Sequence, residues 1–413
     1  MNTNYRKKKL KILFLSNRGL LPIKDGHTRR SFNILKGMAK VHRVHYLSLY
    51  EQSEEIDPIN IGHLESICEK VEFYPAPLKS ISIQMISRIV RSLFSLDPYS
   101  LWRHYSTPFS RRVSELVLVN KYDIVHCDIL PLAYTVRRIN GVMRTITDHD
   151  VSYLKCESMG KKSDRMILKL FLNVESVKLK RLESTIFKQV DYGVVVSEHD
   201  KNILEKLCPE GRFIVIENGV DVAVFQPDNS MIEPEKLIWL GGFDHYPNEQ
   251  GINYFIEEIY PDIKKKLPTV KLDIVGGGVK EKLLRMTHDD PSINVMGYVD
   301  DPLPIMQKAA VFVVPILSGG GTRLKVLEAM SAGKAIVTTS IGCEGIEGSD
   351  GKHFIIADTP DSFADSVTNV LNDAHLRKQL GGNARQLAKE KYDWNIIVKK
   401  LNEFYIEAIA GSE

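Results

Sequence analysis

Short apolar runs rich in β-branched residues alternate with segments of helical spacing, and this alternation constrains the fold more than any other feature of the chain. Each run is about a strand in length and leads into a helical segment, which predicts parallel sheets with helices on both faces. The runs form two series. The first comprises residues 11–16, 43–49, 122–127, 143–148 and 191–197, and the second comprises 236–242, 271–277, 293–297, 311–316 and 335–340.

Two such series predict two domains, and 413 residues are too many for one ordinary core. We therefore expect an α/β protein with two Rossmann-like, doubly wound parallel-sheet domains, over residues 1–216 and 217–394. The join falls in a stretch of turn-forming residues, 217–236, which follows the further strand-like run 212–216. We interpret the long helical stretch 168–188, which has periodic Leu, Val and Phe, as a packing helix rather than a catalytic element.

The net charge of +3 gives no reason to expect a nucleic-acid partner. The charge is uneven, because residues 1–40 hold eleven Lys or Arg and a single acid, Asp25. Two interpretations stay open: a solvated basic tail, or attraction to an anionic surface such as the inner face of a membrane or a phosphorylated substrate.

The cysteines and the apolar segments favour a cytoplasmic protein. The five cysteines form no C-x-x-C pair, so a disulfide framework and a zinc site are both poor interpretations. The apolar run 12–15 is too short for a signal peptide, and no run of about 18 apolar residues is present to span a bilayer.

The segment SGGGTRLKVLEAMSAGKAIVTT, residues 318–339, carries the strongest functional signal. Its glycines follow the predicted strand 311–316 and precede a helix expected from Thr322 to Gly333. Ligands of open α/β sheets bind beyond the carboxyl ends of the strands. Because a helix start presents unpaired N–H groups and glycines let an anion approach closely, the pattern predicts a phosphate site.

Glu328 lies four residues after Leu324, so the two share a helix face with an offset of about 6 Å along the axis. This offset suits a diphosphate at the helix start and a ribose diol one turn deeper, where a carboxylate accepts from both hydroxyls. Arg323 and Lys325 would add positive charge near the phosphates. The alternative is an ordinary βα turn with Glu328 as a solvated surface acid.

Four segments in the second half occur in the order and spacing of a known family: IENGVDVAVFQP, LDIVGGG, INVMGYVDD and LKVLEAMSAGKAIVTT. Three segments in the first half match the same family more loosely: DGHTRRSFNILKGMAK, TDHDVSY and VVVSEHD. The chain thereby resembles the retaining glycosyltransferases of family 4, the group 1 glycosyltransferases, which have the GT-B fold. The resemblance implies an acceptor-binding domain facing a nucleotide-sugar-binding domain across a cleft. It also implies a C-terminal helix, 395–413, that crosses back onto the first domain.

The implied reaction moves a sugar from a nucleotide diphosphate sugar to a hydroxyl acceptor, with retention, in cell-surface polysaccharide or lipid-linked glycan assembly. The leaving diphosphate oxygen would accept the acceptor's proton, so no carboxylate pair like that of a glycosidase is needed. Neither a metal nor a cofactor beyond the nucleotide sugar is implied. We discount the D-x-D pattern at 148–150, because a helix start and basic residues can neutralise a diphosphate.

The resemblance assigns catalytic roles to Glu328 and to His149, which would orient the donor sugar and stabilise positive character at the anomeric carbon. Without the resemblance, a lone His in a loop is more often a structural donor. The expected donor-binding residues are Gly26, Gly242, Asn248, Tyr298, Val299, Gly320, Gly321, Thr322, Arg323, Leu324 and Lys325. The backbone around Tyr298 and Val299 would meet the base, with a packing role for the Tyr298 ring as the alternative.

The chain departs from the family in its donor-binding motifs. The family's E-x7-E pattern ends at Glu328 here but begins at Gly320, so one carboxylate contact to the donor sugar is missing. Gly242 and Asn248 stand where the family commonly has Arg and Lys. Our hypothesis is that Arg323, helped by Lys325, supplies the lost positive charge.

The acceptor side shows a further departure, since Asp25-Gly26 replaces a Gly-Gly pair. Gly26 keeps the close backbone approach, whereas Asp25 has no explanation from the sequence. Arg29 and Asp150 are acceptor-side candidates, and Arg29 is either a phosphate-steering residue or a solvated first-turn arginine.

Residues 81–96 carry apolar residues at helical spacing, together with Arg88 and Arg91. They form either an interfacial helix that brings the site to a lipid-linked acceptor or, as we favour, a helix packed on the first domain. Three rival functions remain: a nucleotide-sugar epimerase, a non-catalytic nucleotide-sugar-binding subunit and a dehydrogenase. The dehydrogenase is the weakest, because VGGGVKE lacks the third glycine of G-x-G-x-x-G.

Overall fold

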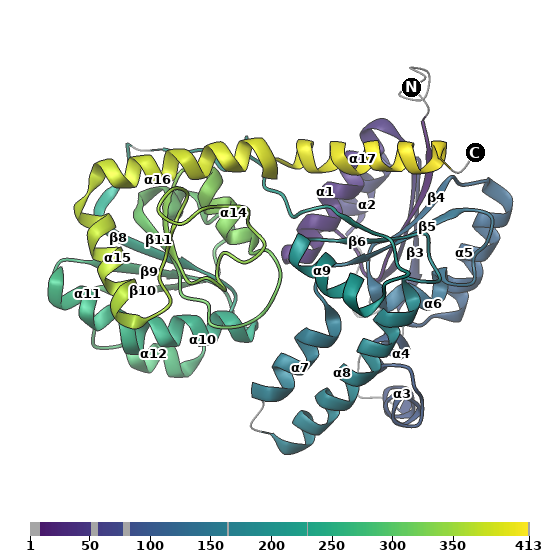
Figure 1. The fold of residues 1–413 in the computed structure, drawn as a ribbon, viewed down its shortest axis with the longest axis horizontal. Helices are drawn as coiled ribbons and strands as arrows, with labels where there is room; N and C mark the ends of the chain where they lie inside the picture. Colours follow the sequence, from purple (N-terminus) through teal and green to yellow (C-terminus); the bar gives the residue numbers. More distant parts are fainter. Residues whose placement is uncertain (1–8, 51–56, 77–82, 163–164, 229, 412–413) are drawn as a thin grey trace. The chain divides into compact units, whose positions relative to one another are not determined.

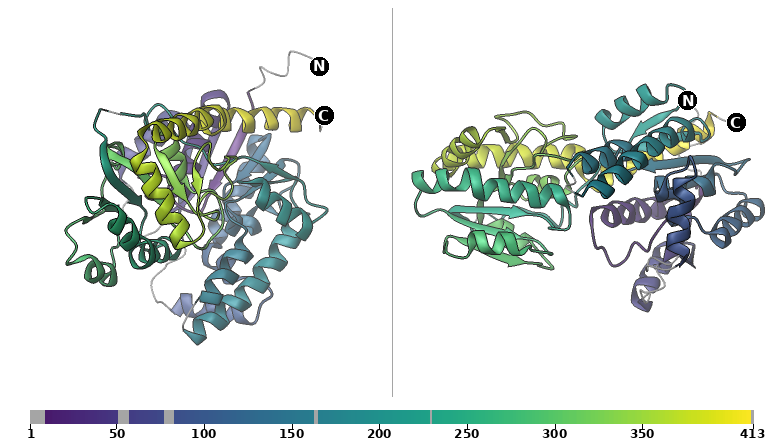
Figure 2. Two further views of the ribbon diagram at one scale, coloured as in Figure 1. Left: turned by 60° about the vertical axis from the view of Figure 1, so that its left-hand side comes forward. Right: turned by 90° about the horizontal axis from the view of Figure 1, so that it is seen from below.

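A computed structural model describes residues 9–50, 57–76, 83–162, 165–228 and 230–411. The chain forms two compact units: Met1–Glu217 with Ile397–Glu413 make unit 1, and Asn218–Ile396 make unit 2. The predicted division after residue 216 lies one residue before this boundary. Figures 1 and 2 show helices on both faces of a sheet in each unit, so the predicted α/β fold class is confirmed.

Unit 1 is built on a seven-stranded, all-parallel sheet with the order β3-β2-β1-β4-β5-β6-β7. The strands are β1 (Lys11–Ser16), β2 (Arg43–Tyr50), β3 (Lys70–Pro75), β4 (Ile124–Cys127), β5 (Met143–Asp148), β6 (Tyr192–Val195) and β7 (Phe213–Val215). The chain winds outward from β1 in one direction and from β4 in the other. The topological switch point, where open sheets of this kind bind ligands, therefore lies beyond the carboxyl ends of β1 and β4.

Unit 2 repeats this winding in a six-stranded parallel sheet with the order β10-β9-β8-β11-β12-β13. The strands are β8 (Glu233–Leu240), β9 (Lys271–Val275), β10 (Ile293–Gly297), β11 (Ala309–Val314), β12 (Ala335–Thr338) and β13 (Ile355–Ile356). Here the switch point lies beyond β8 and β11.

Two strands, β3 and β13, escaped the sequence prediction. β3 lies at the edge of its sheet, and its Glu72 pairs with Arg112, so the segment lacks the continuous apolar character of the buried strands. β13 has only two residues, too few for a recognisable pattern.

The helices of unit 1 are α1 (Gly26–Val41), α2 (Pro58–Ile67), α3 (Ile83–Leu93), α4 (Tyr99–His104), α5 (Thr107–Asn120), α6 (Ala133–Val136), α7 (Ser152–Lys162), α8 (Met166–Ile186) and α9 (Glu198–Leu207). Those of unit 2 are α10 (Tyr246–Tyr254), α11 (Tyr260–Lys266), α12 (Glu281–Thr287), α13 (Leu303–Lys308), α14 (Leu324–Ser331), α15 (Pro360–Asn372) and α16 (Ala374–Leu387). None of the helices in the described part of the chain has the length and hydropathy needed to cross a bilayer.

The last helix, α17 (Trp394–Ala410), begins in unit 2 and continues in unit 1. In unit 1 its buried Tyr405 hydroxyl lies 2.6 Å from His126 Nδ1 and 3.0 Å from Thr145 Oγ1. The C-terminal helix expected over 395–413 therefore packs on the sheet of the first unit, through β4 and β5.

The predicted packing helix 168–188 is α8, which pairs with α7 through Cys156, Leu172 and Leu179 (Figure 1). Two buried acids of α8 serve as caps for other helices. The Glu175 carboxylate accepts hydrogen bonds from the amides of Tyr99 and Ser100 at the start of α4, both at 2.9 Å. Glu183 accepts from the Ser152 amide at the start of α7, at 2.6 Å.

The segment 81–96 contains α3, but several of the side chains on which its interpretation depended lie outside the described residues. Among those described, Arg88 is half-buried and lies 3.5 Å from the carbonyl oxygen of Arg103, while Val90, Phe94 and Leu96 are exposed. The basic residues 6–8 also lie outside the described residues.

A contact between two glycines fixes where α14 ends against α16. A Cβ at Gly381 would lie 2.0 Å from the carbonyl oxygen of Gly333, the residue that ends α14 in the left-handed region, with φ +67°. A Cβ at the next residue, Gly382, would meet nothing within 4 Å, and Gly382 is exposed. The two positions therefore form a natural test pair.

We expect Gly381→Ala to lower the free energy of unfolding of unit 2 by about 1–3 kcal/mol, because the methyl group must displace backbone. Gly382→Ala should instead stabilise the helix by up to about 1 kcal/mol. Urea unfolding followed by the fluorescence of the buried Trp239 and Trp394 measures both. Equal effects of the two substitutions would contradict this account of the packing.

Candidate active site

The predicted donor-binding residues of unit 2 lie on loops at the carboxyl edge of its sheet. Gly242 follows β8, Tyr298 follows β10, and the glycines 319–321 follow β11. Because β8 and β11 flank the switch point, the topology places two of these loops side by side.

The glycine loop leads into α14, which begins at Leu324, two residues later than predicted. Gly319 and Gly321 adopt φ values of +97° and +81°, which side-chain-bearing residues rarely adopt. No side chain caps the start of the helix. The first amides of α14 therefore keep their capacity to bind an anion. At the other end, the amides of Gly333 and Lys334 donate to the carbonyls of Met330 and Ala329, which completes a Schellman motif.

Arg323 lies at the N-cap position and folds back over the glycine loop. Its Nη1 donates to the carbonyls of Gly320 and, at 2.8 Å, of Gly321. Thr322 is held through its carbonyl, which accepts from Asn218 Nδ2 at 3.3 Å. The guanidinium thus shapes the loop and places positive charge at the helix start.

The structure brings Lys325, Asn248 and Gly242 together. Lys325 Nζ donates to Asn248 Oδ1 and to the carbonyl of Leu240, both at 2.8 Å, and Asn248 Nδ2 donates to the carbonyl of Gly242 at 2.9 Å. Burial and the neighbouring Arg323 lower the pKa of Lys325 to about 7. Two cations held close together at an uncapped helix start make this edge of unit 2 strongly attractive to anions.

Glu328 lies one turn deeper on the same helix and is only 7% exposed, so the alternative of a solvated surface acid is wrong. Tyr298, by contrast, is 75% exposed, which contradicts the alternative of an ordinary packing aromatic. Val299 packs partly into the core of unit 2, and Gly277 lies beside Tyr298. The Tyr298 ring is available to stack on a flat ligand.

In unit 1, the start of the corresponding helix, α1, is capped by a side chain of the protein. Asp25, unexplained from the sequence, is the N-cap of α1 and accepts from the Thr28 amide at 2.8 Å in a capping box. Burial raises the pKa of Asp25, but the Thr28 amide and the Arg18 guanidinium lower it on balance. Gly26 is the first residue of the helix, as expected for a close backbone approach.

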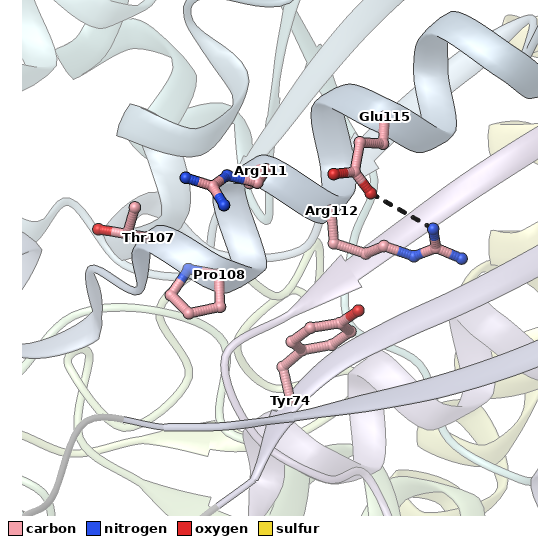
Figure 3. Close-up of a pocket in the computed structure, with 6 residues that line it drawn as sticks. All are labelled: Tyr74, Thr107, Pro108, Arg111, Arg112 and Glu115. Atoms are coloured by element: carbon pink, nitrogen blue, oxygen red, sulfur yellow. Dashed lines mark hydrogen bonds and ion pairs between the residues drawn. The ribbon is translucent and has the colours of Figure 1, made fainter.

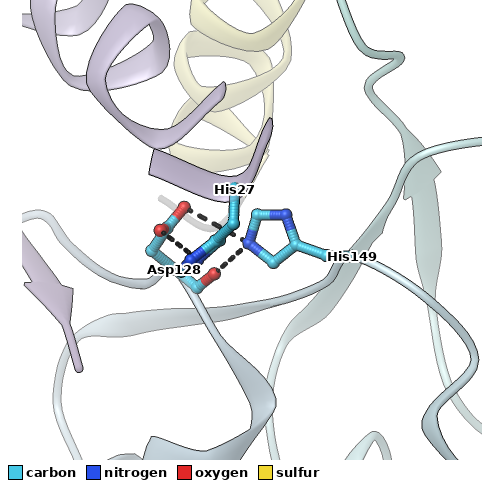
Figure 4. A group of neighbouring side chains, drawn as sticks. All are labelled: His27, Asp128 and His149. Carbon is cyan, nitrogen blue, oxygen red and sulfur yellow. Dashed lines mark hydrogen bonds and ion pairs between the residues drawn. The ribbon is translucent and has the colours of Figure 1, made fainter. Parts of the chain in front are cut away.

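Asp128, the residue after β4, lies at the centre of a cluster of histidines (Figure 4). Its buried carboxylate accepts from Ser31 Oγ and lies 3.4 Å from His27 Nε2 and 3.8 Å from the Nε2 atoms of His126 and His149. Burial alone would raise the pKa of Asp128, but His126 and His27 hold it well below its ordinary value. The carboxylate therefore stays ionised and orients the imidazoles around it.

His149, after β5, lies 2.6 Å through its Nε2 from the carbonyl oxygen of Asp128. Since a carbonyl only accepts, Nε2 carries the proton and Nδ1, on the other side of the ring in Figure 4, keeps a lone pair. Burial, followed by the electrostatic effect of the neighbouring His27, lowers the pKa of His149 to about 3. The ring is thus neutral near pH 7 and offers a hydrogen-bond acceptor.

The acceptor-side candidates meet different surroundings. Arg29 is half-buried in the first turn of α1, whereas its neighbour Arg30 is fully buried and donates to the carbonyls of Ile216 and Glu217 at 2.7 and 2.6 Å. Burial lowers the pKa of Arg30 to about 10. Asp150 is paired with Lys155 at 2.6 Å.

The two carboxylates of the D-x-D pattern point to separate partners. Asp148 is buried, and burial and the charge of Glu183 raise its pKa well above the ordinary value. Burial likewise raises the pKa of Glu183 to about 7. Asp148 and Glu183 are thus buried close together, whereas Asp150 is paired with Lys155, so the two carboxylates of the pattern have different surroundings.

Ligand atoms of His27, Asp128 and His149 lie within 4.8 Å of one another, an arrangement that could hold a metal ion. Arg18 donates to His27 Nδ1 at 3.1 Å, and the charge of Arg30 also acts on His149. These two cations oppose the approach of a divalent ion.

A hollow of about 300 Å³ opens beside β3 and α5, away from the switch point (Figure 3). Arg112, which lines it, donates to both oxygens of Glu72 at 2.9 Å and thereby lowers the pKa of Glu72 to about 2. Since Arg112 is committed to this pair, we assign the hollow no ligand.

Sequence reasoning missed His27, Asp128 and Arg30. Asp128 was detectable, because it is the first residue after the predicted strand 122–127 and so stands at the carboxyl edge of the sheet. His27 sits within the quoted DGHTRR segment. Nothing in the sequence distinguishes the buried Arg30 from its neighbour Arg29.

Comparison with known families gives two matches that together span both units. Residues 25–224 match the family described as Glycosyltransferase Family 4, and residues 234–373 match the family described as Glycosyl transferases group 1.

Two relatives illustrate the range of similarity. An uncharacterized 44.6 kDa protein in the cps region of Klebsiella pneumoniae is 25% identical over 366 residues, covering 85% of this chain and 88% of that protein. A phosphatidyl-myo-inositol mannosyltransferase of Mycolicibacterium smegmatis is 26% identical over 208 residues, covering 48% of this chain and 53% of that protein. This chain thus matches about half the length of the mannosyltransferase.

Solved structures share the whole fold. Sucrose-phosphate synthase from Thermosynechococcus elongatus has a TM-score of 0.72 at 16% identity, covering 98% of this chain and 100% of that chain. HepE of Anabaena in complex with UDP has a TM-score of 0.68 at 14% identity, covering 96% and 99%. At such identities the likeness shows the fold alone, which is GT-B.

The glycine loop generates a prediction about anion binding. Gly319→Ala forces a methyl group into the left-handed region and to 3.1 Å from Pro247, whereas a Cβ at Gly320 meets nothing within 4 Å. We expect Gly319→Ala to weaken nucleotide binding about fivefold, from a strain of about 1 kcal/mol, and Gly320→Ala to stay within about twofold. Calorimetry uses whichever of UDP, GDP and ADP binds most tightly. A loss at Gly320 equal to that at Gly319 would contradict the assigned loop geometry.

Proposed function

The chain belongs to the group 1 glycosyltransferases of family 4, and from this premise we propose that it moves a sugar from a nucleotide diphosphate sugar to a hydroxyl acceptor with retention at the anomeric carbon. The proposed acceptor is a growing polysaccharide or a lipid-linked glycan. Relatives named for a cps region and for phosphatidyl-myo-inositol mannosyl transfer support this choice.

The observation that carries the proposal is the uncapped start of α14 with its two adjacent cations, Arg323 and Lys325. A diphosphate placed there accepts from helix amides and neutralises charges that otherwise repel each other. Glu328, buried one turn deeper, then accepts from the hydroxyls of the ribose. The exposed Tyr298 supports a role beside the base.

His149 acts on the sugar in this proposal. Its neutral ring has an acceptor nitrogen, Nδ1, held in place by the hydrogen bond from Nε2 to the Asp128 carbonyl. An acceptor nitrogen can bind a sugar hydroxyl and lend electron density to positive charge at the anomeric carbon. Because burial and nearby cations keep its pKa far below 7, His149 does not titrate in the working range.

The bond changes balance without a protein base. The bond from the anomeric carbon to the diphosphate oxygen breaks, the bond to the acceptor oxygen forms on the same face, and the acceptor's proton passes to the leaving diphosphate. The cations at α14 and its amides stabilise the developing diphosphate charge, which supports transfer without a metal. We place the reaction in the cytoplasm, at the inner face of a membrane where the acceptor is lipid-linked.

Two alternatives are separated by their products. A nucleotide-sugar epimerase would return an isomerised sugar nucleotide without free nucleotide, and nothing in the comparisons favours it. A non-catalytic binding subunit would bind the donor without turnover, and the loss of a carboxylate at Gly320 is the feature that suggests it.

Turnover tests the proposal directly. A thermal-shift panel of UDP-, GDP- and ADP-sugars selects the donor, and nucleotide release is then measured with lipid-linked and glycan acceptors, with and without EDTA. We expect release that depends on an acceptor, that EDTA changes by less than about twofold, and that yields a product with the donor's anomeric configuration by NMR. His149→Ala should lower kcat, and Glu328→Gln should raise the donor KM about tenfold, for one lost charged hydrogen bond.

Donor isomerisation without release would replace the proposal by the epimerase. Tight donor binding with no turnover on any acceptor would replace it by the binding subunit. Activity that EDTA abolishes and Mg²⁺ or Mn²⁺ restores would move the charge-stabilising role to a metal.

The lowered pKa of Lys325 predicts a pH dependence of donor binding. With a pKa of about 7, its ammonium is present below pH 7 and lost as the pH rises above it. We expect nucleotide-sugar affinity, measured by calorimetry, to fall about tenfold between pH 6.5 and 8.5. Lys325→Met should bind weakly with little pH dependence. Lys271→Met, at the opposite end of a strand in the same sheet, serves as control. An unchanged pH profile in Lys325→Met would refute the assignment.

A further inference from the structure

The outer face of α8 carries an unusual stripe of exposed apolar side chains. Met166, Ile167, Leu170, Val174 and Val177 are all exposed, and Met166 and Ile167 are 86% and 87% exposed. At 100° per residue, these five fall within about a third of the helix circumference, opposite the face that packs on α7. These five side chains therefore form one continuous stripe three turns long, and Leu168, which is 43% exposed, lies outside it.

The charges of α8 are divided between its two faces. Its two acids, Glu175 and Glu183, are buried as caps of α4 and α7, as described above. Its exposed charged side chains are all cationic: Lys169, Lys180 and Arg181. The face turned to solvent is thus apolar and basic, with no acid on the described helix to oppose it.

Segments next to α8 along the chain or in space also carry exposed apolar side chains and cations. Met159, near the end of α7, is half-exposed, and the exposed Lys161 nearby pairs with Glu157. Lys178 donates to the carbonyl of Ser92 and so attaches the end of α3 to α8. The residues that follow α3 include the exposed Phe94 and Leu96. Exposed apolar side chains therefore also occur near the end of α7 and after α3.

We propose that this surface of the α7–α8 hairpin docks onto a lipid bilayer rich in anionic headgroups. An apolar stripe flanked by cations lies in the plane of a bilayer interface, with its apolar side chains among the acyl chains and its cations at the headgroups. The docking element is thus α8 and not the segment 81–96 considered from the sequence. Docking on a bilayer is independent of the transfer reaction, because vesicle binding can be measured in the absence of turnover.

The charge pattern selects a bilayer over a second copy of this chain. A self-complementary contact through α8 would bring Lys169, Lys180 and Arg181 of two copies together, and the helix face offers no acid to pair with them. Docking would also serve the site, because α7 begins three residues after His149. A lipid-linked acceptor would then lie in the same interface as the hairpin that follows His149.

The test is co-sedimentation of the full-length protein with vesicles. We expect binding to phosphatidylcholine vesicles that contain 30% phosphatidylglycerol, about tenfold weaker binding to pure phosphatidylcholine, and release by high salt. The variant Ile167→Glu with Leu170→Glu should bind the anionic vesicles at least tenfold less. The matched control is Leu118→Glu with Val119→Glu, which makes the same charge change at two exposed apolar residues of α5 and should stay within twofold.

Folding and function are monitored separately in both variants, by circular dichroism, melting temperature and nucleotide binding. Loss of vesicle binding with these three unchanged supports the docking surface, even if no acceptor is ever found. Absence of vesicle binding by the unmodified protein overturns the proposal, as does equal loss in the two variants. A dimer seen by sedimentation velocity that Ile167→Glu with Leu170→Glu dissociates, without vesicle binding, would assign the stripe to a second copy instead.

Discussion

Parallel pairing obliges every strand of a sheet to end at the same edge, and the placement of the candidate site residues in each unit follows from this constraint. In unit 1 it gathers the residues after β1, β4 and β5, which include His27, Asp128 and His149. In unit 2 it sets the loop after β8 beside the loop after β11, so that Asn248 and Lys325, far apart in sequence, meet at 2.8 Å. In each unit, the chemistry of these residues depends on one edge of the sheet.

The two units treat equivalent helix starts in opposite ways. The start of α1 is closed by its own Asp25 carboxylate, whereas that of α14 has no side-chain cap and stands beside two cations. A helix start that its own chain leaves uncapped has residual affinity for an anion, and one that is capped has little. The same local architecture therefore yields an anion-binding position in unit 2 and a rigid support for His27 in unit 1.

The two acids of α8 in unit 1 are buried as helix caps, so they do not lie on the exposed face of that helix. Glu175 and Glu183 extend from α8 to the starts of α4 and α7, where paired amides hold their carboxylates. Each acid satisfies backbone donors that would otherwise be unpaired, while the contact between α7 and α8 is apolar, through Cys156, Leu172 and Leu179. The outer face of α8, which carries no exposed acid, is apolar and basic.

The sequence by itself determined the α/β class, most strands to within three residues, the glycine loop before α14 and the places of Glu328 in a helix and His149 after a strand, because these features follow from local residue spacing. It did not determine β3, whose charged residues obscure an edge strand, or the start of α14, which lies two residues later than its pattern indicates. Only the tertiary structure decided that Asp128 orients three histidines, that Arg30 is buried where Arg29 is not, and that the acids of α8 point inward. Each of these depends on which distant backbone groups lie nearby, and residue spacing along one segment carries no information about that.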